Sequence, residues 1–154
     1  MKIKSNLIEA HIFRRSGNEE IEFLAMKRVQ EGSYPNIWQM VTGEIQRNEK
    51  AYKTAFREIK EETGLTPLRL WVLPKINSFY SSEDDCIFMI PVFAAEVNID
   101  DFVTLSFEHS EFKWVDKTEI IKLLAWPGQK KSAEIISEYL LRENEIMKLV
   151  EIKL

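Results

Sequence analysis

Apolar positions in the first forty residues follow the pattern of two strands. Segments 7–14 and 21–29 are rich in Ile, Leu and Phe, and residues 16–18 between them have the Ser-Gly-Asn composition of a turn. The polar stretch 30–36 predicts a loop, after which a short extended piece ends at Gly43. This part of the chain therefore predicts β-structure with polar connections.

The pattern changes period after residue 50. Residues 50–63 are rich in Lys, Glu and Ala and close on Gly64, which predicts a helix that ends at a glycine. Segments 68–80 and 86–97 are rich in β-branched and aromatic residues and predict two more strands. The acidic segment 81–85 between them predicts a turn.

The last third of the chain predicts one strand and two helices. The strand spans 111–115, Asp116 is a candidate N-cap for the first helix, and the second helical stretch covers 130–150. Strands thus dominate the first two thirds, with one helix between them and helices at the end. This order predicts an α/β (α+β) fold, a mixed β-sheet sandwiched between helices.

Composition narrows the class of protein. The 154 residues have the size of one compact domain and contain no repeat or flexible linker, so we expect a single domain over 1–154. A formal net charge of −4 is a poor match for nucleic acid, and no segment approaches the roughly 18–20 apolar residues of a membrane span. We expect neither nucleic acid nor membrane as a partner.

The N-terminus and the cysteine count point to the cytoplasm. The first six residues lead into a mixed segment and not into an apolar signal core. The single cysteine, Cys86, excludes an intrachain disulfide and a cysteine metal cluster, and its apolar surroundings predict that it is buried and inert. We therefore expect a cytoplasmic protein.

Three glutamates of the predicted helix share one side. Glu58, Glu61 and Glu62 stand at positions i, i+3 and i+4. On a helical wheel Glu58 and Glu62 fall within about 20° of the apolar residue Ala51, at the edge of the apolar stripe. Carboxylates so placed repel one another and are poorly hydrated, which calls for a compensating cation.

A hard divalent ion is the cation that these ligands favour. Mg²⁺ takes oxygen ligands and joins carboxylates to substrate phosphates, whereas soft metals would find one cysteine and two histidines that are far apart, His11 and His109. The alternative is a solvated Glu/Lys helix with pairs such as Glu49–Lys53. The three glutamates alone leave both interpretations open.

The spacing of the whole segment 43–65 is more specific. Its sequence, GEIQRNEKAYKTAFREIKEETGL, resembles the Nudix box, G-x5-E-x7-R-E-U-x-E-E-x-G-U with U apolar, at every constrained position. The box covers 23 of the 154 residues. The resemblance implies the Nudix fold, a mixed sheet between helices, and hydrolysis of a nucleoside diphosphate linked to another group.

The resemblance also implies roles for individual residues. A metal site for Mg²⁺, with Mn²⁺ as a substitute, would be formed by the carboxylates of Glu58, Glu61 and Glu62 and the backbone carbonyl of Gly43. Arg57 would orient these glutamates, Glu49 would pair with Arg57, and Arg57 and Glu61 count among the catalytic residues.

One feature departs from the common form of the family. Many members have Pro-Gly-Gly before the box, whereas residues 38–43 read W-Q-M-V-T-G. This form, and the later segment 108–114 (EHSEFKW), resemble the branch of the family that contains dihydroneopterin triphosphate pyrophosphohydrolase, also described as a dATP pyrophosphohydrolase. The branch resemblance implies that Glu108 is a metal ligand or the general base. Glu111 competes for this role, a surface position of Glu108 is the alternative, and His109 is expected to be structural.

Candidate substrate contacts come from the loop and strand ends. Arg28 matches a common family position and could bind a phosphate, although an ordinary surface arginine fits equally well. Tyr34, Trp38 and Phe79 could stack on a base or pterin ring, but an aromatic residue beside a strand is more often part of the core.

The sequence thus predicts a Mg²⁺-dependent pyrophosphohydrolase that cleaves a nucleoside triphosphate or dihydroneopterin triphosphate to the monophosphate and pyrophosphate. Its partner is a small nucleotide or pterin triphosphate. The alternatives are a Nudix hydrolase of ADP-ribose, dinucleoside polyphosphates or oxidised nucleotides, and a nucleotide-sensing module without turnover. The oligomeric state is open, with a homodimer among the options.

Overall fold

A mixed sheet of nine strands runs through the part of the chain that the computed structural model describes, residues 1–17, 20–141 and 145–154. The strands are β1 (Lys2–Lys4), β2 (Leu7–Arg15), β3 (Ile21–Arg28), β4 (Trp38–Gln39), β5 (Val41–Glu44), β6 (Arg69–Ser81), β7 (Cys86–Glu96), β8 (His109–Val115) and β9 (Glu151–Ile152). The helices are α1 (Ala51–Thr63), α2 (Lys117–Leu123), α3 (Pro127–Leu141) and α4 (Glu145–Val150).

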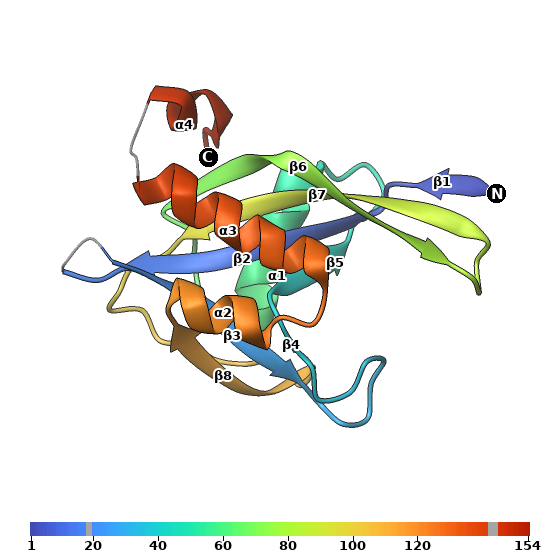
Figure 1. The fold of residues 1–154 in the computed structure, drawn as a ribbon, viewed down its shortest axis with the longest axis horizontal. Coiled ribbons are helices and arrows are strands. Elements are labelled where there is room, and N and C mark those ends of the chain that lie inside the picture. The colour runs from blue at the N-terminus through green and yellow to red at the C-terminus, as the bar shows by residue number, and fades with distance from the viewer. Residues whose placement is uncertain (18–19, 142–144) are drawn as a thin grey trace.

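The strands follow the order β4-β3-β2-β7-β6-β9, and β5, β8 and β1 pair with β2, β3 and β7 respectively. The β2–β7 and β1–β7 pairs are parallel, whereas the other strand pairs are antiparallel. The β6–β7 hairpin, together with β1, extends beyond the helices (Figure 1). The sheet is therefore mixed, as predicted.

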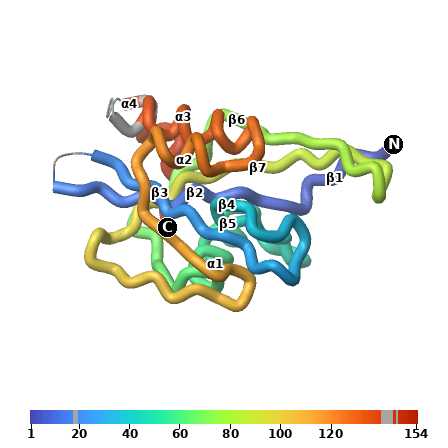
Figure 2. The backbone as a smooth tube through the Cα atoms, turned by 60° about the horizontal axis from the view of Figure 1, so that its bottom comes forward, coloured from blue at the N-terminus to red at the C-terminus, as the bar shows by residue number. Residues whose placement is uncertain are grey.

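Helices cover both faces of the sheet, with α1 on one side and α2 and α3 on the other (Figure 2). Alternate residues of β2 enter different core clusters: Ile8 and Ile12 pack with Ile59 of α1, whereas Phe13 packs with Ile120 and Ile136. This alternation is the period of a strand buried on both faces. The predicted fold, a mixed sheet between helices, is confirmed.

Local signals set the ends of two helices. Gly64 follows α1 with a φ of 72°, and its N–H donates to the carbonyl of Lys60 over 2.9 Å. A left-handed residue at this place is most easily a glycine. The side chain of Asp116 accepts a hydrogen bond of 2.8 Å from the N–H of Glu119 and caps α2. Both predictions are confirmed.

Some elements differ from the prediction. The short strands β1 and β9 were not predicted, because two or three residues are too few to show a period. The stretch 130–150 contains two helices, α3 and α4, and not one. Residues 142–144 of that stretch, and Asn18 of the predicted turn, lie outside the described residues.

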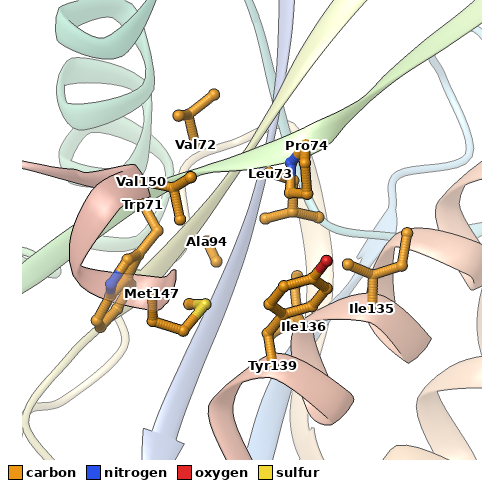
Figure 3. A pocket seen from close by; sticks show the side chains of 10 residues that line it. All are labelled: Trp71, Val72, Leu73, Pro74, Ala94, Ile135, Ile136, Tyr139, Met147 and Val150. Carbon is orange, nitrogen blue, oxygen red and sulfur yellow. The ribbon is translucent and has the colours of Figure 1, made fainter. Parts of the chain in front are cut away.

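The layer of α3 and α4 against β6 is closely packed. A cavity of about 10 Å³ remains there, lined by apolar side chains that include Leu73, Ile136 and Met147 (Figure 3). A space of this size holds at most one water molecule. None of the described helices is long and apolar enough to cross a membrane.

Candidate metal and active site

The side chain of Arg57 stands at the centre of the carboxylates of α1. Its Nε and Nη2 donate to the two carboxylate oxygens of Glu49 over 2.9 and 3.0 Å. Its Nη1 donates to Glu58 over 2.6 Å and to Glu61 over 3.1 Å. A further bond of 3.1 Å runs from Nη2 to the backbone carbonyl of Glu44. One guanidinium thus holds three carboxylates and the end of β5.

Glu49 is fixed by more than this ion pair. It also accepts hydrogen bonds from the backbone N–H of Gln46 (3.1 Å) and the hydroxyl of Thr54 (2.8 Å). The hydrogen bonds from Arg57 lower the pKa of Glu49 to about 2, so the carboxylate stays ionised. Glu49 therefore does not form the surface pair with Lys53 that a solvated helix would have, but faces Arg57.

Glu62 is the most deeply buried of the glutamates of the box. Its side chain is 4% exposed, and its Oε2 has no hydrogen-bond partner among the described residues. One ligand atom from each of Glu62, Glu108 and His109 lies within 4.8 Å of the others. Burial, followed by the negative charges of Glu108 and Glu58, raises the pKa of Glu62 to about 9. A pKa of about 9 means that Glu62 holds a proton at neutral pH, which a bound divalent ion would displace.

The loop 97–108 brings Glu108 to Glu62. It connects β7 to β8 and runs past the end of α1 (Figure 2, yellow to gold). The N–H of Thr104 donates to the carbonyl of Thr63 over 2.8 Å, and that of Ser106 donates to the carbonyl of Glu62 over 3.1 Å. These bonds satisfy carbonyls that the helix end leaves open and place Glu108 two residues further on.

Gly43 lies directly against Glu58. A Cβ at Gly43 would come within 2.3 Å of Glu58 Cγ, so only glycine allows this approach. Gly43 pairs with Ile8 in the sheet, which fixes its position. Burial raises the pKa of Glu58, while Arg57 opposes this effect. The backbone of β5 and Glu58 of α1 therefore lie against each other.

His109 and Arg28 complete the surroundings of the cluster. The amide of Gln39 donates to His109 Nε2 over 3.0 Å, and burial together with the charge of Arg28 lowers the pKa of His109 to about 4. The charge of Arg28 also acts on Glu62, and the Nε of Arg28 is buried without a hydrogen-bond partner among the described residues. A structural role for His109 stays a prediction, and the sequence predicts no role for Gln39, because its contact with His109 joins residues 70 positions apart.

The three predicted aromatic contacts have different surroundings. Trp38 packs against the core cluster on the α2 and α3 side of the sheet. Tyr34 is 60% exposed and makes an edge contact of 5.7 Å with Trp126. Phe79 stacks on Phe88 at 5.0 Å in the β6–β7 hairpin. Of the three, Tyr34 keeps the most exposed surface.

Glu111, the competitor of Glu108, has a different environment. It accepts a hydrogen bond of 3.1 Å from Lys27 Nζ, and its side chain is 59% exposed. Glu111 does not belong to the group formed by Glu62, Glu108 and His109. Cys86 is buried, as predicted.

A second buried carboxylate lies on the other face of the sheet. Glu9 of β2 is 6% exposed and accepts hydrogen bonds from Asn77 Nδ2 (2.5 Å) and from Gln129 Nε2 of α3 (3.4 Å). Lys75 donates in turn to the carbonyl oxygen of Asn77. Burial raises the pKa of Glu9, and the hydrogen bond from Asn77 opposes the shift. No sequence pattern predicts this network, because it joins residues of β2, β6 and α3 that are far apart in the chain.

A mixed sheet between helices, with a cluster of carboxylates at one helix, is the arrangement to compare with known protein families. The NUDIX domain family matches residues 7–139. The chain therefore belongs to the Nudix family of hydrolases, which act on pyrophosphate bonds, and the expected class of enzyme is confirmed.

Individual relatives are more distant. The asymmetrical bis(5′-nucleosyl)-tetraphosphatase of Caenorhabditis elegans is 30% identical over 115 residues, covering 73% of this chain and 79% of that protein. An RNA pyrophosphohydrolase of Haemophilus influenzae is 35% identical over 97 residues, covering 52% and 50%. An octanoyltransferase of Myxococcus xanthus is 27% identical over 80% of this chain, which spans only 34% of that protein.

Solved structures share the fold. A NUDIX hydrolase from Listeria monocytogenes has a TM-score of 0.77 at 26% identity, with 90% of this chain and 96% of that chain covered. The dihydroneopterin triphosphate pyrophosphohydrolase of Escherichia coli has a TM-score of 0.68 at 21% identity, with 87% and 99% covered. The second likeness is one of fold alone.

Proposed function

We propose that the protein is a Mg²⁺-dependent pyrophosphohydrolase that cleaves a nucleoside triphosphate or dihydroneopterin triphosphate to the monophosphate and pyrophosphate. The observation that carries this proposal is the buried oxygen of Glu62, which lacks a hydrogen-bond partner among the described residues and lies beside Glu108. A buried carboxyl group close to a second one is neutralised either by a proton or by a bound cation, and the family membership supports the cation because it supplies the reaction class.

The residues present fit a hard divalent ion. Glu58, Glu61, Glu62 and Glu108 offer carboxylate oxygens, and Gly43 offers a backbone carbonyl, which are ligands that Mg²⁺ and Mn²⁺ accept. When bound, such an ion would neutralise the phosphate oxygens and make water a stronger acid. The net charge of −4 then no longer opposes binding of a polyphosphate.

In this proposal, residues of the protein orient the metal ligands and accept a proton. Arg57 holds Glu58 and Glu61 in one arrangement through its Nη1, so these side chains need not reorganise when substrate binds. In this proposal Glu108, which lies beside Glu62, takes a proton from the attacking water or ligates the ion. Arg28, whose charge acts on Glu62, binds a phosphate group of the substrate.

A second candidate substrate class is the dinucleoside polyphosphates. It is favoured by the likeness to the tetraphosphatase of C. elegans, which extends over most of both chains. Tyr34 and Trp126 form an exposed aromatic pair, whereas Trp38 is half-buried against the core cluster on the α2 and α3 side. Tyr34 is therefore the candidate of the two for stacking on a base of a dinucleoside polyphosphate.

Product identification tests the proposal. Purified protein with Mg²⁺ is incubated with nucleoside triphosphates, dihydroneopterin triphosphate, diadenosine tetraphosphate and ADP-ribose, and the products are separated by chromatography. We expect pyrophosphate and a monophosphate from a triphosphate, and no turnover after chelation of the metal. If diadenosine tetraphosphate is cleaved to ATP and AMP and no other substrate is turned over, the second candidate is favoured. Absence of turnover with every substrate would overturn the proposal and favour a sensing module.

A further inference from the structure

A separate open cavity of about 320 Å³ lies between the loop 97–108 and the sheet. Its volume is within the range of small-molecule sites, about 300–1,000 Å³. The residues that the argument uses come from β2, the loop and β8: Arg14, Asp100, Asp101, Phe102, Phe112 and Trp114. Neither the Nudix box nor the carboxylate cluster contributes to this lining.

The cavity lies on the face of the sheet that carries the carboxylate cluster. Phe112 pairs with Met26 and Trp114 pairs with Leu24 across β3 and β8, and both partners belong to the core cluster packed against α1. Directly paired residues share a face, so Phe112 also faces the α1 side. Phe112 stands three residues after His109 on β8, a separation of about 10 Å along a strand.

Aromatic rings are exposed at this cavity to an unusual degree. Phe102 is 90% exposed and Phe112 is 41% exposed. Exposed apolar rings beside a concave surface mark binding sites more often than isolated ones do. Exposed aromatic rings favour flat ligands, because every nucleobase has a ring face that can stack on them.

Two carboxylates at the rim lack partners. The backbone N–H groups of Asp100 and Asp101 bond to Asn98 in a turn, but neither side-chain carboxylate has a hydrogen-bond or ion-pair partner among the described residues. A carboxylate accepts two parallel N–H bonds well, as it does from the fork of an arginine. A ligand with two adjacent N–H donors would match this geometry.

Arg14 does not oppose such a ligand. Its guanidinium lies 4.2 Å from the centre of the Trp114 ring and donates to Glu22 over 3.2 Å, so its charge is already compensated. The planar group adds a flat surface to the cavity wall.

We propose that this cavity is a subsite for a fused bicyclic ring that carries an N–H next to an exocyclic amino group, with Phe102 and Phe112 as stacking surfaces and Asp100 or Asp101 as acceptor. Guanine and pterin rings share this edge, whereas adenine lacks the ring N–H. The inference rests on the proposed function, because it places the ring of that substrate within reach of the carboxylate cluster. It adds a specificity site outside the Nudix box.

Binding without turnover tests the subsite directly. Metal-free protein is titrated with GMP, dihydroneopterin and AMP, and affinity is measured by calorimetry for the wild type, for Phe102→Ala and for the double variant Asp100→Asn, Asp101→Asn. These side chains are exposed, and circular dichroism with thermal melts checks folding. Loss of one stacked ring should weaken binding about tenfold or more. We expect this loss for GMP or dihydroneopterin in Phe102→Ala and in the double variant, with AMP the weakest ligand of the wild type.

Phe107→Ala is the matched control, because Phe107 is 88% exposed on the same loop but does not line the cavity. Its affinities should equal those of the wild type. If the substitutions weaken the binding of GMP alone, the ring that the subsite binds is a guanine. If they weaken the binding of dihydroneopterin alone, the ring is a pterin. Equal affinity in Phe102→Ala and wild type, or no binding by the wild type, overturns the subsite. Because calorimetry measures binding without hydrolysis, a result that contradicts the subsite leaves the proposed hydrolytic activity untouched.

Discussion

Glu62 and Glu9 are both buried carboxylates, but they lie on opposite faces of one sheet and have opposite surroundings. Glu9 receives hydrogen bonds from two amides, those of Asn77 and Gln129. Glu62 has an oxygen without a partner among the described residues and a second carboxylate, Glu108, beside it. Burial raises the pKa of both groups. A raised pKa is therefore common to both carboxyl groups, and what distinguishes Glu62 is an oxygen without a partner among the described residues.

The surroundings of the two carboxyl groups indicate which of them is the candidate cation site. Neutral amides satisfy the oxygens of Glu9 without any ligand and fix α3 on the sheet. At Glu62 the neighbouring groups add negative charge, which a proton or a bound cation would offset. Matched substitutions on the two faces test this difference.

The largest effect is expected for Glu62→Gln, which should remove most of the hydrolytic activity while the protein stays folded. In metal-free protein the pKa of Glu62 rises from the ordinary 4.5 to about 9, so the unfolded chain releases this proton more readily than the folded one. The free energy of unfolding should then fall as the pH rises from about 4.5 to 9, and the Gln variant should lack this part of the decline. Thermal melts with a chelator across this pH range measure it.

Glu9→Gln is the matched control. One of its two amide donors, Asn77 or Gln129, would face a new NH₂ group, so stability should fall by about 1–3 kcal/mol. Turnover per folded molecule should stay at the wild-type value. Near-normal turnover of Glu62→Gln at saturating Mg²⁺ would show that Glu62 is no metal ligand.

The next largest effect is expected for Glu108→Gln. A general base contributes about 10²–10⁴-fold, so kcat should fall by that factor with little change in KM. If Glu108 is instead a ligand, raising the Mg²⁺ concentration should recover part of the loss. Glu111→Gln serves as the control, because Glu111 bonds to Lys27 outside the cluster. A silent Glu108→Gln together with an inactive Glu111→Gln would move the base to Glu111.

A smaller loss is expected for Arg57→Ala. The carboxylates of Glu58 and Glu61 remain, but lose the group that orients them, and such losses run to about 10–100-fold in activity or metal affinity. Steady-state kinetics over a Mg²⁺ titration measure both quantities. Lys53→Ala, an exposed change on the same helix, should be neutral. Equal rates for Arg57→Ala and Lys53→Ala would exclude an orienting role.

The smallest effect on activity is expected for Gly128→Ala on the Glu9 side. Its Cβ would come within 2.8 Å of Asn77 Oδ1, so stability should fall by about 1–3 kcal/mol while turnover per folded molecule is kept. Gly43→Ala pushes on Glu58 instead and should lose activity beyond its loss of stability. Thermal melts measure the loss of stability of each variant, and kinetics measure its turnover per folded molecule. A Gly128→Ala protein that is folded but inactive would show that the Glu9 side also affects activity.

Sequence reasoning succeeded where the signal was local. The glycine after α1, the cap at Asp116 and the helix that carries Glu58 and Glu62 all follow from residues within a few positions of one another. The Arg57–Glu49 pairing was also expected, and the hydrogen bonds of both carboxylate oxygens are present. The roles of these residues in catalysis stay predictions.

The remaining features depend on contacts between distant segments. The Glu9 network joins residues 9, 77 and 129, and the hydrogen bond between Gln39 and His109 spans 70 positions. Strand β9 is two residues long and exists only because β6 offers an edge to it. Trp38 was predicted to stack on the substrate, but its side chain lies on the face of the sheet opposite the carboxylates. Neighbouring residues of a strand point to opposite sides, and the sequence does not show which side is which.

The loop 97–108 has two parts with different tolerance to change in length. Its second part is tied to the last carbonyls of α1 through Thr104 and Ser106, so an insertion between Ser106 and Glu108 would carry the carboxylate away from Glu62. Its first part forms an exposed turn around Asp100 and lines the open cavity. We expect insertions or deletions there to alter binding at the proposed subsite while Glu62 and Glu108 keep their positions, which would give a separate place to change selectivity.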